Sequence, residues 1–187
     1  MNIDALKFKF NNLLQEWNKV YYVALCKGYE NIKPRLIIEE YIEEIAATDS
    51  DYKIFCFNGK PKLFYIANNF ASNNSHDSQR VSYYDINGER LPIVYDGYQQ
   101  SNIKKLEIND RIKEMLKISE KIASVFPFVR VDFFNTKQKL YLAELTFTPG
   151  GGFGKYEPRE YDYKIGEYLE LSQLPKEYVN QIPELNN

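Results

Sequence analysis

Four side chains in the last third of the chain could together bind a metal ion and a phosphate. Arg130 and Asp132 lie two residues apart in one apolar stretch, and Glu144 and Thr146 lie two residues apart in the next. Because side chains alternate along a strand, each pair would share a face. A turn centred near residues 136 and 137 would bring Asp132 and Glu144 to within a residue or two of facing each other.

Two carboxylates at that distance repel each other unless a positive charge lies near them. Mg²⁺ relieves such repulsion well, because it prefers one or two carboxylates together with phosphate oxygens and water. The planar guanidinium of Arg130 could hold a phosphate or a substrate carboxylate. The alternative is that Asp132 and Glu144 are ordinary acids on a solvent-exposed sheet face, and spacing alone leaves both interpretations open.

A glycine run follows the second stretch, at residues 150–152, with Gly154 and Lys155 just after it. A P-loop has four residues between its glycines, followed by Lys-Ser or Lys-Thr. Here three residues separate Gly150 from Gly154, and Tyr156 follows Lys155. The spacing therefore argues against a P-loop, and we expect the run to let the backbone come close to a ligand.

Zinc binding and disulfide formation are poorly supported. His76 is the only histidine, and Cys26 and Cys56 are the only cysteines. A structural zinc site needs four such ligands at short spacings. Each cysteine sits in an apolar run, so we expect both to be buried, reduced thiols.

The composition is that of a globular protein without an obligate nucleic-acid partner. The chain has 187 residues, 44% of them hydrophobic, with 16 Tyr and 12 Phe that favour sheet. Its net charge is -2 and no block of like charges stands out, which argues against nucleic-acid binding. No apolar run approaches the ~20 residues of a membrane span, and the N-terminus lacks signal-peptide features. We therefore expect a cytoplasmic protein.

Apolar spacing predicts two helices. Residues 3–18, within an N-terminal helix over 1–19, place apolar side chains on one stripe. Residues 109–125 do the same, and Asn109 or Asp110 can cap that helix.

Alternating apolar residues predict the strands that would carry the site. The five expected strands are residues 34–42, 52–57, 62–67, 128–134 and 140–148. Asn58-Gly59 predicts a hairpin between the second and third, because both turn residues must accept positive φ. Residues 68–102 are expected to be a long loop excursion with at most short strands, and 172–187 a loosely held tail. The sequence thus predicts an α+β fold with a mostly antiparallel sheet and packed helices.

Taken together and in order, these pieces resemble the ATP-grasp fold, and specifically its TupA-like family. The stretches that carry the resemblance are Lys33–Ile42, Asp51–Gly59, Phe126–Phe134 and Leu142–Phe153. The resemblance spans about residues 20 to 171. It implies an ATP-grasp-like nucleotide- and metal-binding domain over residues 1–171, corresponding to the C-terminal half of that fold.

On the nucleotide side, the resemblance implies a hinge and two cationic positions. The hinge residues would be Glu39, Glu40, Tyr41 and Ile42, whose backbone reads the adenine edge while an acid reaches the ribose. Lys53 would face the nucleotide or its phosphates. Arg80 resembles a family position on the nucleotide side.

On the metal side, the resemblance implies that Asp132 and Glu144 hold Mg²⁺ against the phosphates of ATP. Thr146 stands where many ATP-grasp enzymes have a metal-binding Asn. Arg130 would steady the transferred phosphoryl group, so that Arg130 and Lys53 are the expected catalytic residues.

The resemblance implies an ATP-dependent carboxylate–amine ligase that works through an acyl phosphate. The expected acceptor is a uronic acid or an amino-acid carboxylate in surface-polysaccharide or teichuronopeptide material. Three alternatives stay open: a truncated, non-catalytic binding module, a plain structural or interaction protein, and a kinase that transfers phosphate to a hydroxyl.

Family members usually carry an earlier lobe with a lysine-bearing strand and a glycine-containing phosphate loop. Here only one helix and a short run precede residue 39. We therefore expect a truncated form, half of a split enzyme or a natural short form, with a partner chain as the source of the lobe.

Overall fold

The computed structural model describes residues 2–24, 32–46, 50–68, 79–95 and 97–173. The chain divides into two compact units, Met1–Tyr41 with Thr148–Phe153, and Ile42–Phe147 with Gly154–Asn187. Both predicted helices and the antiparallel sheet are present, so the α+β prediction is confirmed.

The first unit contains helix α1 (Ile3–Ala24), which extends past the predicted residue 19. The Asn2 side chain caps it, because Asn2 Oδ1 accepts bonds from the backbone N–H groups of Asp4 and Ala5, both at 3.1 Å. The described helices include none that is long and apolar enough to cross a membrane.

The predicted strand over residues 34–42 is wrong. The structure gives residues 32–42 neither helix nor strand, and Ile37 and Ile38 are exposed. A strand is stable only when a neighbour takes up its backbone hydrogen bonds, and no strand among the described residues pairs with this segment. The β-branched residues of this segment therefore favour a strand locally, but no described strand pairs with it.

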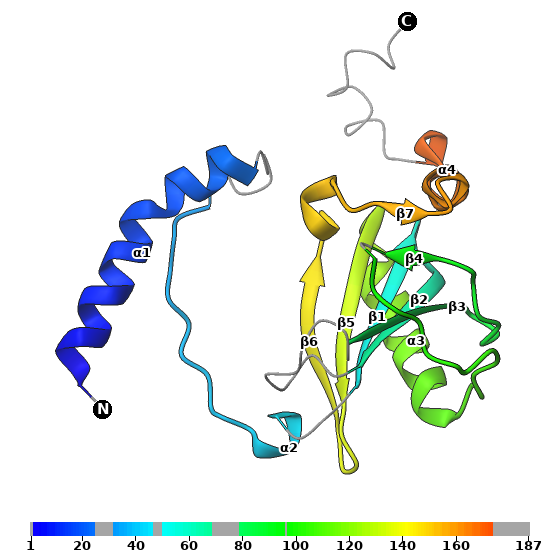
Figure 1. The fold of residues 1–187 in the computed structure, drawn as a ribbon, viewed down its shortest axis with the longest axis horizontal. Coiled ribbons are helices and arrows are strands. Elements are labelled where there is room, and N and C mark those ends of the chain that lie inside the picture. Colours follow the sequence, from blue (N-terminus) through cyan, green and yellow to red (C-terminus); the bar gives the residue numbers. More distant parts are fainter. Residues whose placement is uncertain (1, 25–31, 47–49, 69–78, 96, 174–187) are drawn as a thin grey trace, which may run out of the picture. The chain divides into compact units, whose positions relative to one another are not determined.

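The second unit is built on a five-stranded antiparallel sheet with strand order β3-β2-β1-β5-β6 (Figure 1). The strands are β1 (Ser50–Phe57), β2 (Lys60–Asn68), β3 (Arg80–Asp85), β5 (Phe128–Asn135) and β6 (Leu140–Thr146). A small second sheet pairs β4 (Val94–Tyr95) with β7 (Tyr156–Glu157). The helices are α2 (Glu43–Ala46), α3 (Asp110–Ala123) and α4 (Glu160–Gly166).

Both predicted hairpins are confirmed. Asn58 and Gly59 connect β1 to β2 with φ values of 46° and 79°, the left-handed region that an Asn-Gly turn provides. β5 and β6 form the second hairpin, which begins at the pair Asn135 and Leu140.

The predicted loop over residues 68–102 contains more structure than expected. β3 lies within it and forms a six-residue edge of the main sheet, with Tyr83 and Tyr84 fully buried. Its neighbouring side chains are buried on both faces, so it lacks the apolar–polar alternation typical of a strand with one exposed face. Residues 69–78, including His76, lie outside the described part.

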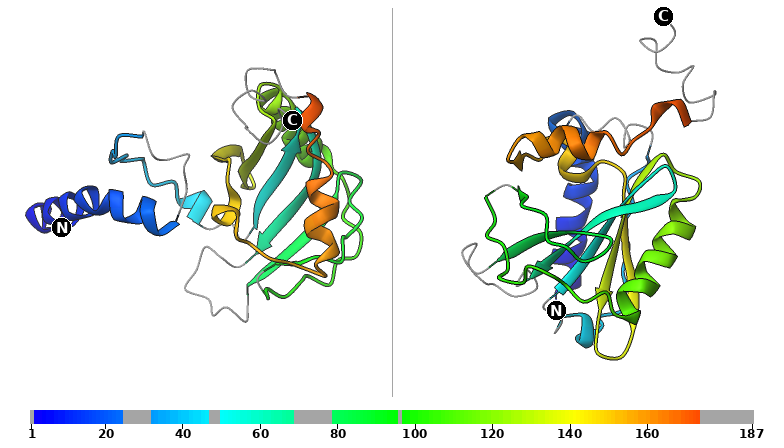
Figure 2. Two further views of the ribbon diagram at one scale, coloured as in Figure 1. Left: turned by 90° about the horizontal axis from the view of Figure 1, so that it is seen from above. Right: turned by 90° about the vertical axis from the view of Figure 1, so that its right-hand side faces the viewer.

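Helix α3 covers one face of the sheet (Figure 2). It begins as predicted at Asn109, whose Oδ1 accepts a bond from the Ile112 N–H at 3.1 Å. Ile112 and Met115 pack into a core with apolar residues from the facing strands, among them Val131. Cys56 belongs to this core, and burial raises the pKa of its thiol to about 12, which keeps it protonated. Cys26 lies outside the described residues.

The other face carries a second core at its β2–β3 end. Phe55, Leu63, Tyr65 and Tyr83 pack there with Ile165 of α4. Phe128 of β5 packs against this core, and Arg130 and Asp132, where the candidate site lies, follow it on the same face. Of the predicted tail 172–187, the structure describes only residues 172 and 173, within a 3₁₀ turn (Leu171–Gln173).

Candidate nucleotide- and metal-binding site

Three neighbouring strands bring the predicted metal and cation residues together. In the sheet register, Asp132 of β5 pairs with Lys53 of β1 on one side and with Glu144 of β6 on the other. Two residues before Asp132 on β5, Arg130 pairs with Thr146 of β6. Lys53, Arg130, Asp132, Glu144 and Thr146, which we call the charged cluster, therefore gather on one sheet face.

The alternation of β5 explains why this face is polar. Val129, Val131 and Phe133 are all buried toward α3, so Arg130 and Asp132 must point to the opposite face. The register shifts between Asp132 and Phe133. Such bulges are common next to active sites, where they redirect a side chain.

Asp132 is held by two cations. Lys53 Nζ donates to Asp132 Oδ2 at 2.7 Å. Arg130 makes a two-point contact, with Nε 2.7 Å from Oδ1 and Nη2 2.7 Å from Oδ2. The Asp132 side chain is only 2% exposed, so these bonds compensate for the removal of its charge from water.

The β6 residues complete the cluster on its solvent side. Arg130 Nη2 donates to Thr146 Oγ1 at 2.8 Å and lies 3.9 Å from Glu144 Oε2. The Glu144 side chain is 59% exposed. The two carboxylates thus differ, since Asp132 is enclosed by cations whereas Glu144 is open to an incoming ligand.

Burial and charge act in opposite directions on Arg130. Burial lowers the pKa of its guanidinium, but the hydrogen bonds and charge of Asp132 raise it more, so the net pKa is raised. Arg130 therefore keeps its positive charge across the biological pH range.

Asp51 is a further acidic residue beside the cluster that the sequence analysis did not single out. It lies two residues before Lys53 on β1 and so shares its face. Burial raises the pKa of the Asp51 carboxyl, the charge of Lys53 opposes this, and that of Asp132 adds to it. The alternation in Asp51-Tyr52-Lys53 is the signal that could have found it.

The donor set fits Mg²⁺ when phosphate oxygens complete the coordination. Among the described residues, Asp132 Oδ1 accepts one bond, from Arg130 Nε, so it retains a lone pair toward them. Glu144 stands directly opposite, and Thr146 offers a hydroxyl. No group of three or more His, Cys, Asp or Glu residues gathers in the described part of the chain, and Mg²⁺ needs only one or two carboxylates when it also binds phosphates.

The predicted hinge residues are divided between the units. Glu39, Glu40 and Tyr41 are exposed and belong to the first unit. Ile42 begins the second unit, immediately before α2. Their nucleotide-binding role stays a prediction.

Arg80 is not brought to the charged cluster. It begins β3, at the sheet edge opposite β6. By alternation it shares the face of Tyr84, which packs into the α3-side core, whereas the cluster faces the other way. Its predicted nucleotide contact therefore has no support from this arrangement.

Helix α2 is attached to the β5–β6 hairpin, a link that sequence reasoning missed. Glu44 Oε2 accepts a bond from Thr136 Oγ1 at 3.0 Å, and Glu44 Oε1 accepts one from the Tyr141 hydroxyl. This holds the segment just after Ile42 against the hairpin that carries Asp132 and Glu144. Glu44 is 92 positions from Thr136 and 97 positions from Tyr141, and no local sequence pattern predicts contacts over such separations.

The glycine run forms a tight turn in the first unit. Gly150, Gly151 and Gly152 have φ values of 58°, 66° and 82°. Residues with a Cβ are strained at such angles, so this backbone path depends on glycine.

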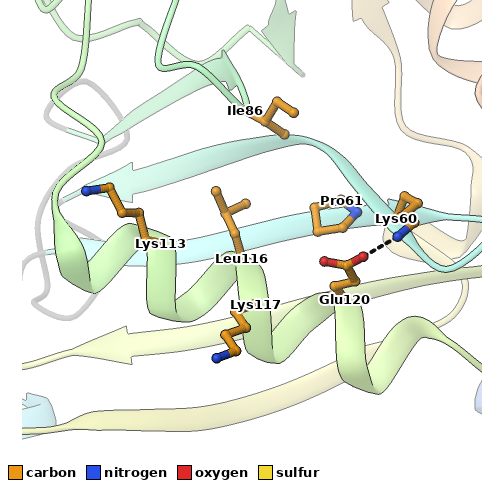
Figure 3. Close-up of a pocket in the computed structure, with 7 residues that line it drawn as sticks. All are labelled: Lys60, Pro61, Ile86, Lys113, Leu116, Lys117 and Glu120. Atoms are coloured by element: carbon orange, nitrogen blue, oxygen red, sulfur yellow. Dashed lines mark hydrogen bonds and ion pairs between the residues drawn. The ribbon is translucent and has the colours of Figure 1, made fainter.

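A pocket of about 380 Å³ lies elsewhere, between α3 and the strands β2 and β3 (Figure 3). Its walls are Lys60, Pro61, Ile86, Lys113, Leu116, Lys117 and Glu120. Lys60 and Glu120 form an ion pair across it. None of the charged-cluster residues lines this pocket.

The profile of the family described as TupA-like ATPgrasp matches residues 1–170. The chain belongs to the TupA-like ATPgrasp family. No curated protein and no solved structure matches the chain. Membership of the TupA-like ATPgrasp family confirms the resemblance seen in the sequence and gives this chain the fold of ATP-dependent ligases, whose members typically bind ATP and Mg²⁺.

Proposed function

We propose that this chain binds ATP with Mg²⁺ and activates a carboxylate for amide formation during surface-polysaccharide biosynthesis. The observation that carries the proposal is that Lys53 and Arg130 both donate hydrogen bonds to Asp132, which lies directly opposite the exposed Glu144. A buried ion cluster is seldom kept for stability alone, and perturbed charges in a family known for phosphoryl transfer favour a functional site.

The proposed reaction is balanced in two steps. A carboxylate oxygen of the acceptor attacks the γ-phosphorus of ATP and ADP leaves, which gives an acyl phosphate. An amine then attacks the acyl carbon, inorganic phosphate leaves, and the amine gives up a proton. The expected acceptor is a uronic acid or amino-acid carboxylate, and we place the reaction in the cytoplasm, where ATP is supplied.

Each cluster residue has a distinct part in this proposal. Asp132 and Glu144 would hold Mg²⁺, which when bound supplies charge stabilisation to the phosphates. Lys53 and Arg130 present positive charge where negative charge spreads during transfer. Because Asp132 fixes both cations before the ligand arrives, little reorganisation is needed.

Titration of the chain with ATP, with and without Mg²⁺, tests the proposal. Calorimetry should detect Mg²⁺-dependent binding that weakens at least about 100-fold in Asp132→Asn, since the variant loses a charged ligand. Asp110→Asn is the matched control, because its side chain is fully exposed on α3. Equal ATP binding in wild type and Asp132→Asn would count against the site.

A non-catalytic binding module is the second candidate. The observation that favours it is that three hydrogen bonds from the protein's own cations already occupy Asp132. Metal-dependent ATP turnover that is abolished by Glu144→Gln supports the ligase. ATP binding without turnover supports the binding module, provided that turnover is still absent after a chain that supplies an N-terminal lobe is added.

A further inference from the structure

The row of residues that contains Lys53 and Asp132 continues across the sheet as tyrosines. Lys53 pairs with Tyr65 of β2, and Tyr65 pairs with Tyr83 of β3. The five positions Tyr83, Tyr65, Lys53, Asp132 and Glu144 therefore form one continuous row. Lys53 lies between the aromatic end and the acidic end of this row, and Arg130 lies beside Asp132 on the same face.

The cations have hydrogen-bond donors left over on the described surface. Arg130 uses Nε and Nη2 for Asp132 and Thr146, and no described residue accepts a bond from its Nη1. Lys53 Nζ donates only to Asp132 among the described residues, although an ammonium has three donors. Unused donors in a largely buried place favour binding of an anion.

The Tyr65 hydroxyl is a further donor beside them. Tyr65 makes no hydrogen bond within the described part of the chain. Its hydroxyl oxygen is not fully enclosed by the protein. Tyr65 as a whole is 9% exposed, so this hydroxyl reaches solvent through a small opening. The Tyr83 hydroxyl, by contrast, is completely enclosed.

Tyr65 and Arg130 are close enough to influence each other's ionisation. Burial raises the pKa of Tyr65 well above its ordinary value; Arg130 acts against this rise, and Asp132 adds to it. The hydroxyl therefore keeps its proton and can donate it in a hydrogen bond.

We propose that the Tyr65 hydroxyl and Arg130 Nη1 together bind the carboxylate of the acceptor substrate. This proposal rests on the proposed function. The carboxylate lies on the aromatic side because Glu144 repels anions on the other side, where only metal-bound phosphate can be placed. The charged Nη1 donor of Arg130 and the phenol can each donate to one carboxylate oxygen, and both side chains are largely buried, which strengthens such bonds.

Tyr65→Phe and Tyr83→Phe form a matched pair for the test, because each removes one hydroxyl and keeps the packed ring. The 187-residue chain is titrated by calorimetry with D-glucuronate, with inorganic phosphate and, separately, with ATP plus Mg²⁺. We expect Tyr65→Phe to weaken glucuronate binding about 10-fold, since a hydrogen bond to a charged group is lost. We expect Tyr83→Phe to match wild type, and ATP binding to stay unchanged in both variants.

Several results would overturn the subsite. These are unchanged glucuronate binding in Tyr65→Phe, an equal loss in Tyr83→Phe, binding of phosphate but not glucuronate, and no glucuronate binding by the wild type. If wild type binds ATP in these cases, the proposed function stands and only the subsite falls. Failure of wild type to bind ATP instead counts against the proposed function, whatever the glucuronate result.

Discussion

The apolar core under α3 and the charged cluster on the opposite face of the sheet bury their side chains for different reasons. On the α3 face, Val131 and Phe133 pack against Ile112 and Met115, and no described residue places a buried charged side chain in this core. On the opposite face, the same strand presents Asp132, which is buried among cations. One strand thus serves both faces by simple alternation.

Burial of apolar side chains and burial of an ion cluster contribute differently to the free energy of unfolding. Apolar burial stabilises the fold by roughly 25 cal/mol per Å². Burial of an ion pair costs desolvation that the attraction between the charges often fails to offset, so an apolar replacement is frequently neutral or better. The two apolar cores therefore hold the fold together, and the charged cluster is there for what it binds. The predictions below test this division of labour.

Removal of side-chain volume on the α3 face should affect stability alone. Met115 is completely buried, so Met115→Ala should lower the free energy of unfolding by about 3 kcal/mol through lost burial and a cavity. Urea denaturation measures this. Val125→Ala, at an exposed position, should change stability by less than about 0.5 kcal/mol. A loss of ATP affinity in folded Met115→Ala would contradict the separation between core residues that stabilise the fold and cluster residues that bind ligand.

A conservative change in the charged cluster should affect activity more than the fold. Arg130→Lys keeps the charge but cannot make the two-point contact with Asp132 or reach Thr146 at the same time. Under the proposed function, ATP turnover should fall about 100-fold.

Arg111→Lys is the control for that change, because Arg111 donates to the Gln138 carbonyl at an exposed site. A normal rate for Arg130→Lys would mean that only the charge matters there. Equal losses in both variants would remove the special role of the cluster.

The capping residue of α3 should have a smaller effect, confined to stability. Asn109→Ala removes the acceptor of the Ile112 N–H bond and should cost about 1 kcal/mol. Thermal or urea unfolding checks this, with exposed Asn102→Ala as the comparison. Equal stability in these two variants would contradict the assigned cap.

The link between α2 and the hairpin should give the smallest effect, visible in the pH dependence. The Tyr141 hydrogen bond lowers the pKa of Glu44; burial opposes this, and Thr136 and Lys139 add to the lowering, so the net pKa lies below 4.5. A carboxyl with a lowered folded pKa stabilises the protein above its ordinary pKa, and this contribution is lost as pH falls through the lowered value.

The stability difference between wild type and Glu44→Gln should therefore be greatest near neutral pH and shrink below pH 4.5. Unfolding curves across that range measure the difference. Tyr141→Phe should flatten the same pH dependence, because it removes the main cause of the shift. A difference that stays constant down to low pH would show that the Glu44 bonds do not form.

The sequence by itself determined the features that depend on near neighbours. Asn58-Gly59 specified one hairpin because few other residue pairs accept its φ angles. Alternation in β5 placed Arg130 and Asp132 on one face, and the short turn after it brought Glu144 to within one residue of facing Asp132. The register shift between Asp132 and Phe133, which the sequence did not specify, completed the pairing of Asp132 with Glu144. The Asn109 cap and the family resemblance were likewise predictable from short stretches of residues.

Only the tertiary structure decided which distant segments meet. Lys53 contacts Asp132 across 79 positions because β1 pairs with β5, and local patterns do not specify that pairing. Strand pairing also placed Asp132 between β1 and β6, left Glu144 exposed on the edge strand β6, and put β3 beside β2 at the other edge. Residues 34–42 show the converse, since a strong local strand signal without a paired neighbour formed no strand.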